Sequence, residues 1–367
     1  MKVLLLTTHL NTGGIAVYTV NLARYLKKVG VDVTVASGGG DMKKILVDNI
    51  IPHLTLDIKT KSEFGLKVWK ASHLLSRMMK AEGFDIVHAQ TRVAQVLGCL
   101  VERKTGVPFI STCHGFFKHH RLGRKLFPCW GRKVIAISDS VRKHLIGDFR
   151  LPGDRVQLVY NGIETGRYSD IGGKDDRLLR NIGLSKEVLL VGAVGRLSSV
   201  KGLNYLVSAF KKAMDRDSRM QLLLVGEGSE KASLEEQVLR EGVSDNVFFA
   251  SGKEAPLEKF LLLMDIFCLP SVSEGLGLSL MEAMAAGRAC VASSIGGPVE
   301  LITPEEDGIL VPPKDPEALS RGIMRLAEDD QLRKRIGQEA RKKALSEFSI
   351  EDSVRKTIKV YEKVVTK

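Results

Sequence analysis

The sequence predicts an α/β protein with two doubly wound domains, each built on a parallel sheet that helices cover on both faces. Apolar, β-rich runs alternate with helical patterns from the N-terminus onward, then the alternation lapses and restarts in the second half. Such alternation is typical of parallel sheets whose strands are joined by helices. The chain has 367 residues, which is enough for two domains with substantial cores.

The first domain is expected to span residues 1–165. Its predicted strands are Val3–Thr7, Val33–Ser37, Ile86–Ala89, Phe109–Thr112 and Val134–Ile137. The predicted helices between them are Ala16–Val29, Leu66–Ala81 and Ala94–Thr105.

The second domain is expected to span residues 166–349. Its predicted strands are Val188–Val194, Gln221–Val225, Val247–Ala250, Ile266–Leu269 and Ala289–Ala292. Its predicted helices are Leu203–Met214, Ser229–Glu241, Leu257–Met264 and one that begins near Ser279 and contains Glu282. The stretch from Asn161 to Lys186 lacks strong periodicity and is the best candidate for a linker. The tail after Pro316 is helical and ends in an amphipathic segment, Ile350–Val365.

The positive charge of the chain is concentrated in the first domain. Residues 1–165 carry 25 Lys and Arg against 12 Asp and Glu, giving +13, whereas residues 166–367 carry 30 against 31, giving −1. A basic surface on one domain attracts an anionic partner such as a membrane, a phosphorylated lipid, an acidic glycan or a nucleic acid. A solvated basic surface without a partner is an equally good interpretation.

The cysteines and the apolar runs indicate a cytoplasmic protein without a membrane span. The five cysteines are scattered and lack metal-ligand spacing, which favours reduced thiols. No apolar stretch approaches the roughly 18 residues of a spanning helix, and the apolar run at the start is too short for a signal peptide.

The most informative segment is Ser273–Gly287, which carries Glu274 and Glu282 with seven residues between them. The spacing suits a clamp on a nucleotide-linked sugar, because eight helical residues rise about 12 Å. Gly275 and Gly277 let backbone N–H groups approach a ligand, and the start of the following helix favours a diphosphate. The alternative is a strand–loop–helix unit in which Glu274 caps the helix and Glu282 is a solvated acid of its first turn.

The surrounding string Pro-Ser-x-x-Glu-Gly-Leu-Gly-x-x-x-x-Glu-Ala-Met-Ala-x-Gly, residues 270–287, resembles the signature of retaining nucleotide-sugar glycosyltransferases, in particular glycosyltransferase family 4 (glycosyl transferases group 1). The resemblance implies a GT-B fold, in which two Rossmann-like domains face each other and the last helix, here residues 350–367, returns to the first domain. It implies that the donor is bound by Glu274, Gly275, Leu276, Gly277, Leu278 and Glu282.

Two further strings match phosphate-binding landmarks of the family. Gly195-Arg196 follows a predicted strand and Lys201-Gly202 precedes a helix, so Arg196 and Lys201 suit a diphosphate leaving group. Gly13-Gly14 follows the first strand, and the resemblance assigns this turn to the donor cleft. Lys253 follows a strand near the place where the family holds the nucleotide base.

His114 lies directly after the strand Phe109–Thr112, and Thr-x-His-Gly matches a segment of the family. The resemblance implies that His114 contacts the transferred sugar. Ser138 and Asn161-Gly162-Ile163 match further landmarks near the cleft and hinge, although a helix cap and a turn are equally credible roles for them.

The expected reaction is transfer of a sugar from a nucleoside diphosphate, with UDP the commoner donor of the family, and with retention of the anomeric configuration. Arg196 and Lys201 would stabilise the departing diphosphate while Glu274 and His114 orient the sugar. No cofactor and no metal are expected. Asp215-Arg-Asp217 resembles an acid-x-acid metal site, but it lies at a helix end before a strand and is interpreted as a solvated loop.

The acceptor is expected on the first domain. The segment Phe116–Trp130 mixes basic and aromatic residues next to His114 and would suit anionic headgroups at an interface. We therefore expect a glycan or lipid-linked acceptor, such as a lipopolysaccharide core, and a cytoplasmic enzyme that is peripheral on the inner face of the membrane. A folded basic loop beside the cleft is the alternative for this segment. A sugar-nucleotide epimerase remains an alternative function, and a nucleic-acid-binding protein is less favoured because no recognised binding motif accompanies the basic half.

Overall fold

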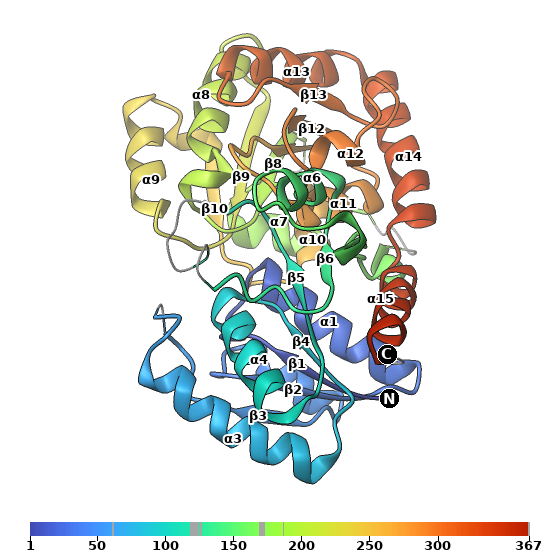
Figure 1. Cartoon of the computed structure of the whole chain (residues 1–367). Helices are drawn as coiled ribbons and strands as arrows, with labels where there is room; N and C mark the ends of the chain where they lie inside the picture. Colours follow the sequence, from blue (N-terminus) through green and yellow to red (C-terminus); the bar gives the residue numbers. More distant parts are fainter. Residues whose placement is uncertain (61, 118–123, 125–126, 169–172, 186, 366–367) are drawn as a thin grey trace. The chain divides into compact units, whose positions relative to one another are not determined.

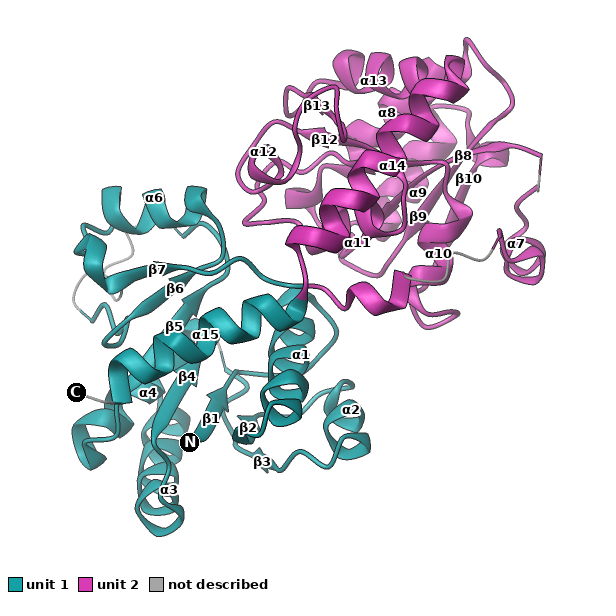
Figure 2. Cartoon of the chain, turned by 90° about the vertical axis from the view of Figure 1, so that its right-hand side faces the viewer, with its two compact units in different colours: residues 1–162, 350–367 teal, residues 163–349 magenta. Residues whose placement is uncertain are grey.

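The computed structural model describes residues 1–60, 62–117, 124, 127–168, 173–185 and 187–365. The chain forms two compact units, one of Met1–Gly162 with Ile350–Lys367 and the other of Ile163–Ser349 (Figure 2). The first boundary therefore falls three residues before the expected one, and the second falls where the sequence analysis placed it.

Unit 1 contains a parallel sheet with the strand order β3-β2-β1-β4-β5-β6-β7. Its strands are β1 (Lys2–Leu6), β2 (Asp32–Ser37), β3 (His53–Thr55), β4 (Ile86–Ala89), β5 (Phe109–Cys113), β6 (Val134–Ala136) and β7 (Val156–Leu158). Its helices are α1 (Gly14–Lys28), α2 (Lys43–Asp48), α3 (Leu66–Glu82), α4 (Arg92–Thr105), α6 (Asp139–Gly147) and α15 (Ile350–Val365).

Strand β1 shows why the apolar runs of this sequence are continuous rather than alternating. Val3 and Leu5 belong to a core shared with α1 and α15, whereas Leu4 and Leu6 belong to a core shared with α3 and α4. Successive side chains of a strand point to opposite faces, so a sheet with helices on both faces buries every residue of its central strands.

The C-terminal helix α15 belongs to unit 1, although the chain reaches it only after the whole of unit 2 (Figure 2). Ser353 Oγ donates to the carbonyl oxygen of Tyr160 at 2.8 Å, and buried Tyr361 packs in the same core as α1. The expected return of the last helix to the first domain is thus confirmed.

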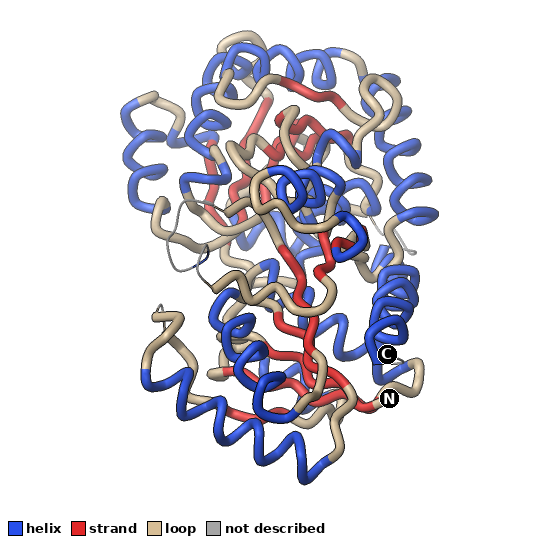
Figure 3. The backbone as a smooth tube through the Cα atoms, in the orientation of Figure 1, coloured by secondary structure: helices blue, strands red, loops and turns tan. Residues whose placement is uncertain are grey.

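Unit 2 contains a second parallel sheet, with the strand order β10-β9-β8-β11-β12-β13. Its strands are β8 (Leu189–Val194), β9 (Met220–Val225), β10 (Val247–Ala250), β11 (Ile266–Leu269), β12 (Ala289–Ser293) and β13 (Ile309–Val311). Its α-helices are α7 (Asp176–Ile182), α8 (Leu203–Met214), α9 (Lys231–Arg240), α10 (Leu257–Leu263), α11 (Leu278–Ala285), α12 (Pro298–Leu301), α13 (Pro316–Glu328) and α14 (Asp330–Glu347). In Figures 1 and 3, helices surround the strands of both sheets.

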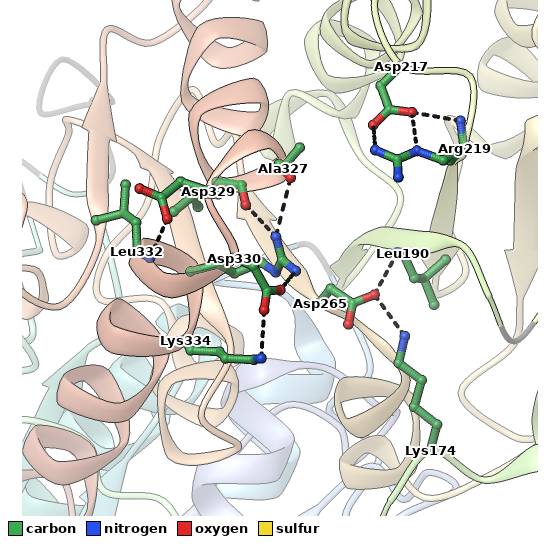
Figure 4. A network of polar contacts seen from close by, with 12 residues as sticks. Lys174, Leu190, Asp217, Arg219, Asp265, Ala327, Asp329, Asp330, Leu332 and Lys334 are labelled. Carbon is green, nitrogen blue, oxygen red and sulfur yellow. Dashed lines mark hydrogen bonds and ion pairs between the residues drawn. The ribbon is translucent and has the colours of Figure 1, made fainter.

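The interpretation of Asn161–Lys186 as a linker is wrong for part of that stretch. Helix α7 lies in it, and Asp175 caps the helix by accepting from the backbone N–H of Leu178 at 3.1 Å. Lys174 Nζ donates at 2.7 Å to Asp265, whose carboxylate also accepts from the N–H of Leu190 at 2.8 Å (Figure 4). The cap fixes the start of α7 and the ion pair holds the segment to the sheet of unit 2, and neither interaction produces a hydrophobic period.

Both sheets reverse their direction of winding at a pair of neighbouring strands, β1 and β4 in unit 1 and β8 and β11 in unit 2. Loops leave such a pair in opposite directions and open a crevice at the carboxyl ends of the strands, which is where ligands bind in open parallel sheets. Among the described helices, none has the length and apolar character needed to cross a membrane.

Candidate active site

The loops that follow β8 and β11 lie against each other at the crevice of unit 2. The backbone N–H of Val272 donates to the carbonyl oxygen of Val200 at 2.8 Å and joins the two loops. A small hollow between them is lined by Ala193, Val194, Gly195, Arg196, Lys201, Leu203, Cys268, Leu269 and Pro270. The sequence-predicted Arg196 and Lys201 therefore lie on the same hollow.

Three glycines allow the backbone to pack closely around this hollow. A Cβ at Gly226 would lie 1.9 Å from the carbonyl oxygen of Gly195, and a Cβ at Gly228 would lie 2.0 Å from that of Leu197. Gly202 has φ +63°, and a Cβ there would lie 2.2 Å from the carbonyl oxygen of Pro270. The loop after β8 is thus held from both sides, which fixes the places from which Arg196 and Lys201 extend.

Lys201 and Glu274 form an ion pair at this crevice. Lys201 Nζ donates to Glu274 Oε2 at 2.6 Å, and Ser271 Oγ donates to the same carboxylate oxygen at 3.1 Å. Both charged side chains are largely buried, with 22% and 14% of their surface exposed. The pair brings together two residues that the sequence analysis predicted separately, one for the diphosphate and one for the sugar. Arg196 lies beside them with an exposed side chain.

Helix α11 begins directly after the glycine-rich turn. It starts at Leu278, one residue before the expected position, and no side chain caps its N-terminus. Gly277 has φ +104°, and Leu276 is buried under Gly297, where a Cβ would lie 2.2 Å from the Cα atom of Leu276. The uncapped turn leaves backbone N–H groups of the helix start for another acceptor.

Glu282 lies four residues into α11, in an environment that the sequence did not indicate. The side chain is mostly buried, and desolvation raises its pKa to about 8. The nearby guanidinium of Arg167 opposes that rise, while the carboxylates of Glu258 and Glu164 add to it. Tyr168, from the same turn as Arg167, has its pKa raised by burial and then by Glu282. The description of Glu282 as a solvated first-turn acid is therefore wrong.

Lys253 and the Asp215–Asp217 loop lie apart from these contacts. Lys253 is exposed in the turn after β10, at the same edge of the sheet as Lys201. Asp215 pairs with Lys211, and Asp217 pairs with Arg219 at 2.7 Å in the exposed loop before β9 (Figure 4). Across the described residues, no group of three or more His, Cys, Asp and Glu side chains is arranged to hold a metal ion.

His114 follows β5 in unit 1, and its ring is held by two neighbours. His114 Nε2 donates to Gln90 Oε1 at 2.9 Å, and its ring makes a T-shaped contact with the ring of Tyr18, with ring centroids 5.0 Å apart. Burial lowers the pKa of His114 to about 3. The imidazole is therefore neutral at physiological pH, and Nδ1 is its acceptor nitrogen.

Gln90 and His88 are polar residues of this region that the sequence analysis missed. Gln90 is buried directly after β4, and its Nε2 has no hydrogen-bond partner among the described residues. His88 Nδ1 and Nε2 lie 2.7 Å from the hydroxyls of Tyr361 and Thr112. His88 lies inside a short strand and Gln90 lies just after it, where the sequence has the pattern of an ordinary buried strand. Only their position where the sheet reverses its direction of winding identifies them as candidates for the site.

The other predicted residues of unit 1 have the following places. Gly13 caps α1, Gly14 is its first residue, and no side chain caps the helix. Ser138 caps α6 by accepting from the N–H of Val141 at 3.1 Å, so the cap is its observed role. The turn Asn161-Gly162-Ile163 lies where the chain leaves unit 1 for unit 2.

The segment Phe116–Trp130 is only partly described. Residues 118–123, 125 and 126, which carry several of its basic side chains, lie outside the described residues. Trp130 is buried, packs edge-on against Phe149 and lies near the guanidinium of Arg124. The expectation that its aromatic residues rest at an interface is therefore wrong for Trp130, which packs into unit 1. Phe116 and Phe127 are exposed.

Comparison with known families covers both units. Residues 12–167 match the model described as Glycosyltransferase Family 4, and residues 175–343 match the one described as Glycosyl transferases group 1. The chain is a family 4 glycosyltransferase with the GT-B fold. The family and the fold class that the sequence predicted are confirmed, and retention of the anomeric configuration stays a prediction.

Similar proteins support the same assignment over the whole chain. D-inositol 3-phosphate glycosyltransferase of Salinispora arenicola is 26% identical, with 97% of this chain and 88% of that protein covered. The Escherichia coli UDP-Gal:alpha-D-GlcNAc-diphosphoundecaprenol alpha-1,3-galactosyltransferase is 25% identical, with 81% and 80% covered. The crystal structure of Anabaena Alr3699/HepE in complex with UDP and glucose has a TM-score of 0.87 at 22% identity and covers 99% of this chain and 100% of that one.

Proposed function

We propose that this glycosyltransferase moves a sugar from UDP to a hydroxyl group of an anionic acceptor and that the anomeric configuration is retained. The observation that carries the proposal is the ion pair of Lys201 and Glu274 at the crevice between β8 and β11. It supplies a cation for a diphosphate and a carboxylate for sugar hydroxyls at one place. Anabaena Alr3699/HepE, which shares the fold, binds UDP and glucose.

In this proposal, donor binding separates Lys201 from Glu274 and gives each side chain a new partner on the donor. A diphosphate that enters the hollow attracts Lys201 and the exposed Arg196, whose guanidinium can make two parallel hydrogen bonds to phosphate oxygens. Lys201 then exchanges Glu274 for phosphate. The released carboxylate keeps its bond from Ser271 and accepts from hydroxyls of the sugar.

Leaving-group stabilisation follows from the same arrangement. As the bond between the anomeric carbon and the diphosphate lengthens, negative charge grows on the phosphate oxygens. Lys201, Arg196 and the uncapped start of α11 then stabilise it. These groups meet the electrostatic demand of the step without a metal ion, so the proposed reaction is metal-independent.

Glu282 is proposed to hold the ribose of the nucleotide. With a pKa of about 8, its carboxyl is largely protonated at neutral pH and offers both a donor and an acceptor to a ribose hydroxyl. Lys253 is proposed to lie near the base. His114, neutral and with Nδ1 free to accept, is proposed to contact a hydroxyl of the transferred sugar.

The acceptor is proposed to be phosphorylated and to bind unit 1. Two similar enzymes are named for inositol 3-phosphate and for a diphosphoundecaprenol-linked sugar, and both acceptors carry phosphate. The +13 charge of residues 1–165 suits such an acceptor. We place the enzyme in the cytoplasm at the inner face of the membrane, in synthesis of an envelope polysaccharide such as the lipopolysaccharide core, with a hexose or N-acetylhexosamine as the transferred sugar.

Proton NMR of the reaction tests this function. UDP-glucose, UDP-galactose and UDP-N-acetylglucosamine are each incubated with the enzyme in EDTA, with and without an extract of undecaprenyl diphosphate-linked sugars. The proposal predicts UDP release that depends on the extract and a product with the donor's α-anomeric coupling. An inverted product would contradict retention, and turnover to a free sugar or isomer without any acceptor would favour the epimerase.

A further inference from the structure

The outer face of α3 in unit 1 exposes large apolar side chains at helical spacing. Leu66, Trp69 and Leu74 are 76%, 56% and 52% exposed. Residues 66, 69, 70, 73, 74 and 77 recur every three or four positions and so form one stripe along the helix. The opposite stripe, which includes Val68 and Leu75, is buried against the sheet. Helix α3 is therefore apolar on both its inner and its outer face, at the lower margin of unit 1 in Figures 1 and 2.

Two phenylalanines extend this surface past the N-terminal end of α3. Phe64 precedes the helix and is 54% exposed, and its ring lies 5.2 Å from that of Phe127, which is 46% exposed. The segments that carry them are tied together, because Arg92 Nε donates to Glu63 Oε2 at 2.8 Å and another of its nitrogens donates to the carbonyl oxygen of Phe127. We call Phe64, Leu66, Trp69, Leu74 and Phe127 the α3 surface.

The charge around the α3 surface is predominantly positive. Residues 57–82 contain six Lys and Arg and three acids, and the acids are paired: Asp57 with Lys67, Glu63 with Arg92 and Glu82 with Lys2. Lys70 and Arg77 lie on the exposed stripe of the helix, and Lys104 from α4 lies over the ring of Trp69, 5.8 Å from its centroid. Aromatic and aliphatic groups that alternate with long cationic side chains are the pattern of a helix that lies in the interface of an anionic bilayer.

We propose that the α3 surface docks unit 1 on an anionic membrane, with Leu66, Trp69 and Leu74 inserted among the acyl chains and Lys70 and Arg77 at the phosphates. The positive charge favours a bilayer over a protein partner. Cationic side chains around an apolar centre complement the phosphate groups on the surface of an anionic membrane. The surface deepens the proposed function, since it would bring the enzyme to a lipid-linked acceptor. From the segment Phe116–Trp130 it takes only Phe127 and leaves out Trp130, which is buried.

Sedimentation with vesicles tests the docking. We expect the enzyme to sediment with vesicles of phosphatidylglycerol and phosphatidylcholine and to stay in solution with phosphatidylcholine alone. Leu66→Ser/Trp69→Ser/Leu74→Ser should weaken binding at least about tenfold, since three apolar side chains no longer leave water. Lys70→Glu/Arg77→Glu should weaken it by about tenfold through charge, an effect that salt reproduces in the wild type.

Two exposed apolar residues on the opposite face of the sheet provide a matched control. Val47, on α2, and Ile50 are 61% and 81% exposed, and Val47→Ser/Ile50→Ser should leave vesicle binding unchanged. Trp69 is the exposed one of the two tryptophans, so tryptophan emission should shift to shorter wavelength on vesicle addition and should not shift in Trp69→Ser. Calorimetric UDP binding should be the same in all these variants, which separates docking from the donor site. Wild-type enzyme that ignores anionic vesicles, or a triple Ser variant that binds them as wild type does, would overturn the docking whatever the enzyme does with UDP.

Discussion

Lys201 Nζ and Glu274 Oε2 lie 2.6 Å apart in a largely buried ion pair at the carboxyl ends of β8 and β11. In the proposed function the two side chains serve different parts of one donor, the diphosphate and the sugar. In the protein without a donor they neutralise each other. The ion pair thus compensates two opposite charges in a site that is largely shielded from water. Neither charge is left buried without a partner before the donor binds.

Release of Lys201 from its partner should strengthen nucleotide binding. Glu274→Gln keeps the size of the side chain but removes the charge that competes with phosphate for Lys201. We expect about three- to tenfold tighter binding of UDP by calorimetry, together with loss of sugar transfer. Lys212→Ala, which breaks the exposed pair with Glu317, is the control and should change neither quantity. Weaker UDP binding by Glu274→Gln would show that the carboxylate supports nucleotide binding rather than competing with it.

The close approach of the two crevice loops can be tested with a pair of glycines. Gly202→Ala places a Cβ 2.2 Å from the carbonyl oxygen of Pro270, whereas Gly242, with nearly the same φ of +67°, has open space around it. Both substitutions carry the same backbone penalty, so their difference reports the contact alone. Gly202→Ala should cost about 1–3 kcal/mol more in free energy of unfolding and should also weaken UDP binding. Equal denaturation midpoints for the two variants would mean that the loop yields without cost.

The raised pKa of Glu282 predicts a dependence of stability on pH. A carboxyl whose pKa is higher in the folded state stabilises that state fully below its ordinary pKa of 4.5, and this contribution is lost as pH rises through about 8. Glu282→Gln removes the ionisation. The variant should therefore gain roughly 1–3 kcal/mol over the wild type between pH 5 and pH 9 in urea unfolding without ligand. A difference that stays constant with pH would show that Glu282 ionises normally.

His114 should act without changing its charge. Because burial lowers its pKa to about 3, no ionisation of His114 should appear in the kcat profile between pH 5 and 8. His114→Gln should lower kcat by about ten- to a hundredfold and leave UDP affinity unchanged, since a hydrogen bond to the sugar is lost. Gln90→Leu should cause a smaller loss by freeing the ring. A wild-type limb near pH 6.5 that disappears in His114→Gln would contradict a neutral histidine.

The sequence predicted most of the long elements, because each has a strong apolar pattern of its own. The strands Ile86–Ala89, Val247–Ala250 and Ile266–Leu269 and the helix Leu203–Met214 lie at the expected residues. It missed α2, α6, α7, α12, β3, β7 and β13, whose three to nine residues are too few to establish a clear period.

The sequence predicted which residues form the donor site but not the contacts between them. Glycines and charged residues after strands marked Arg196, Lys201 and Glu274, whereas their contacts depend on the strand order, which brings β8 beside β11. The environment of Glu282 depends on a turn more than 110 residues earlier in the chain, at Arg167 and Tyr168. No spacing within the 273–287 segment contains that information.

The most direct test of the donor site is a calorimetric titration of UDP into the wild type and into Lys201→Ala, both in EDTA. We expect the wild type to bind UDP without a divalent metal and the substitution to weaken binding by about ten- to a hundredfold, because a charge-assisted bond to phosphate is lost. UDP binding of equal strength in the two proteins, or binding that requires a metal ion, would contradict the proposed donor site.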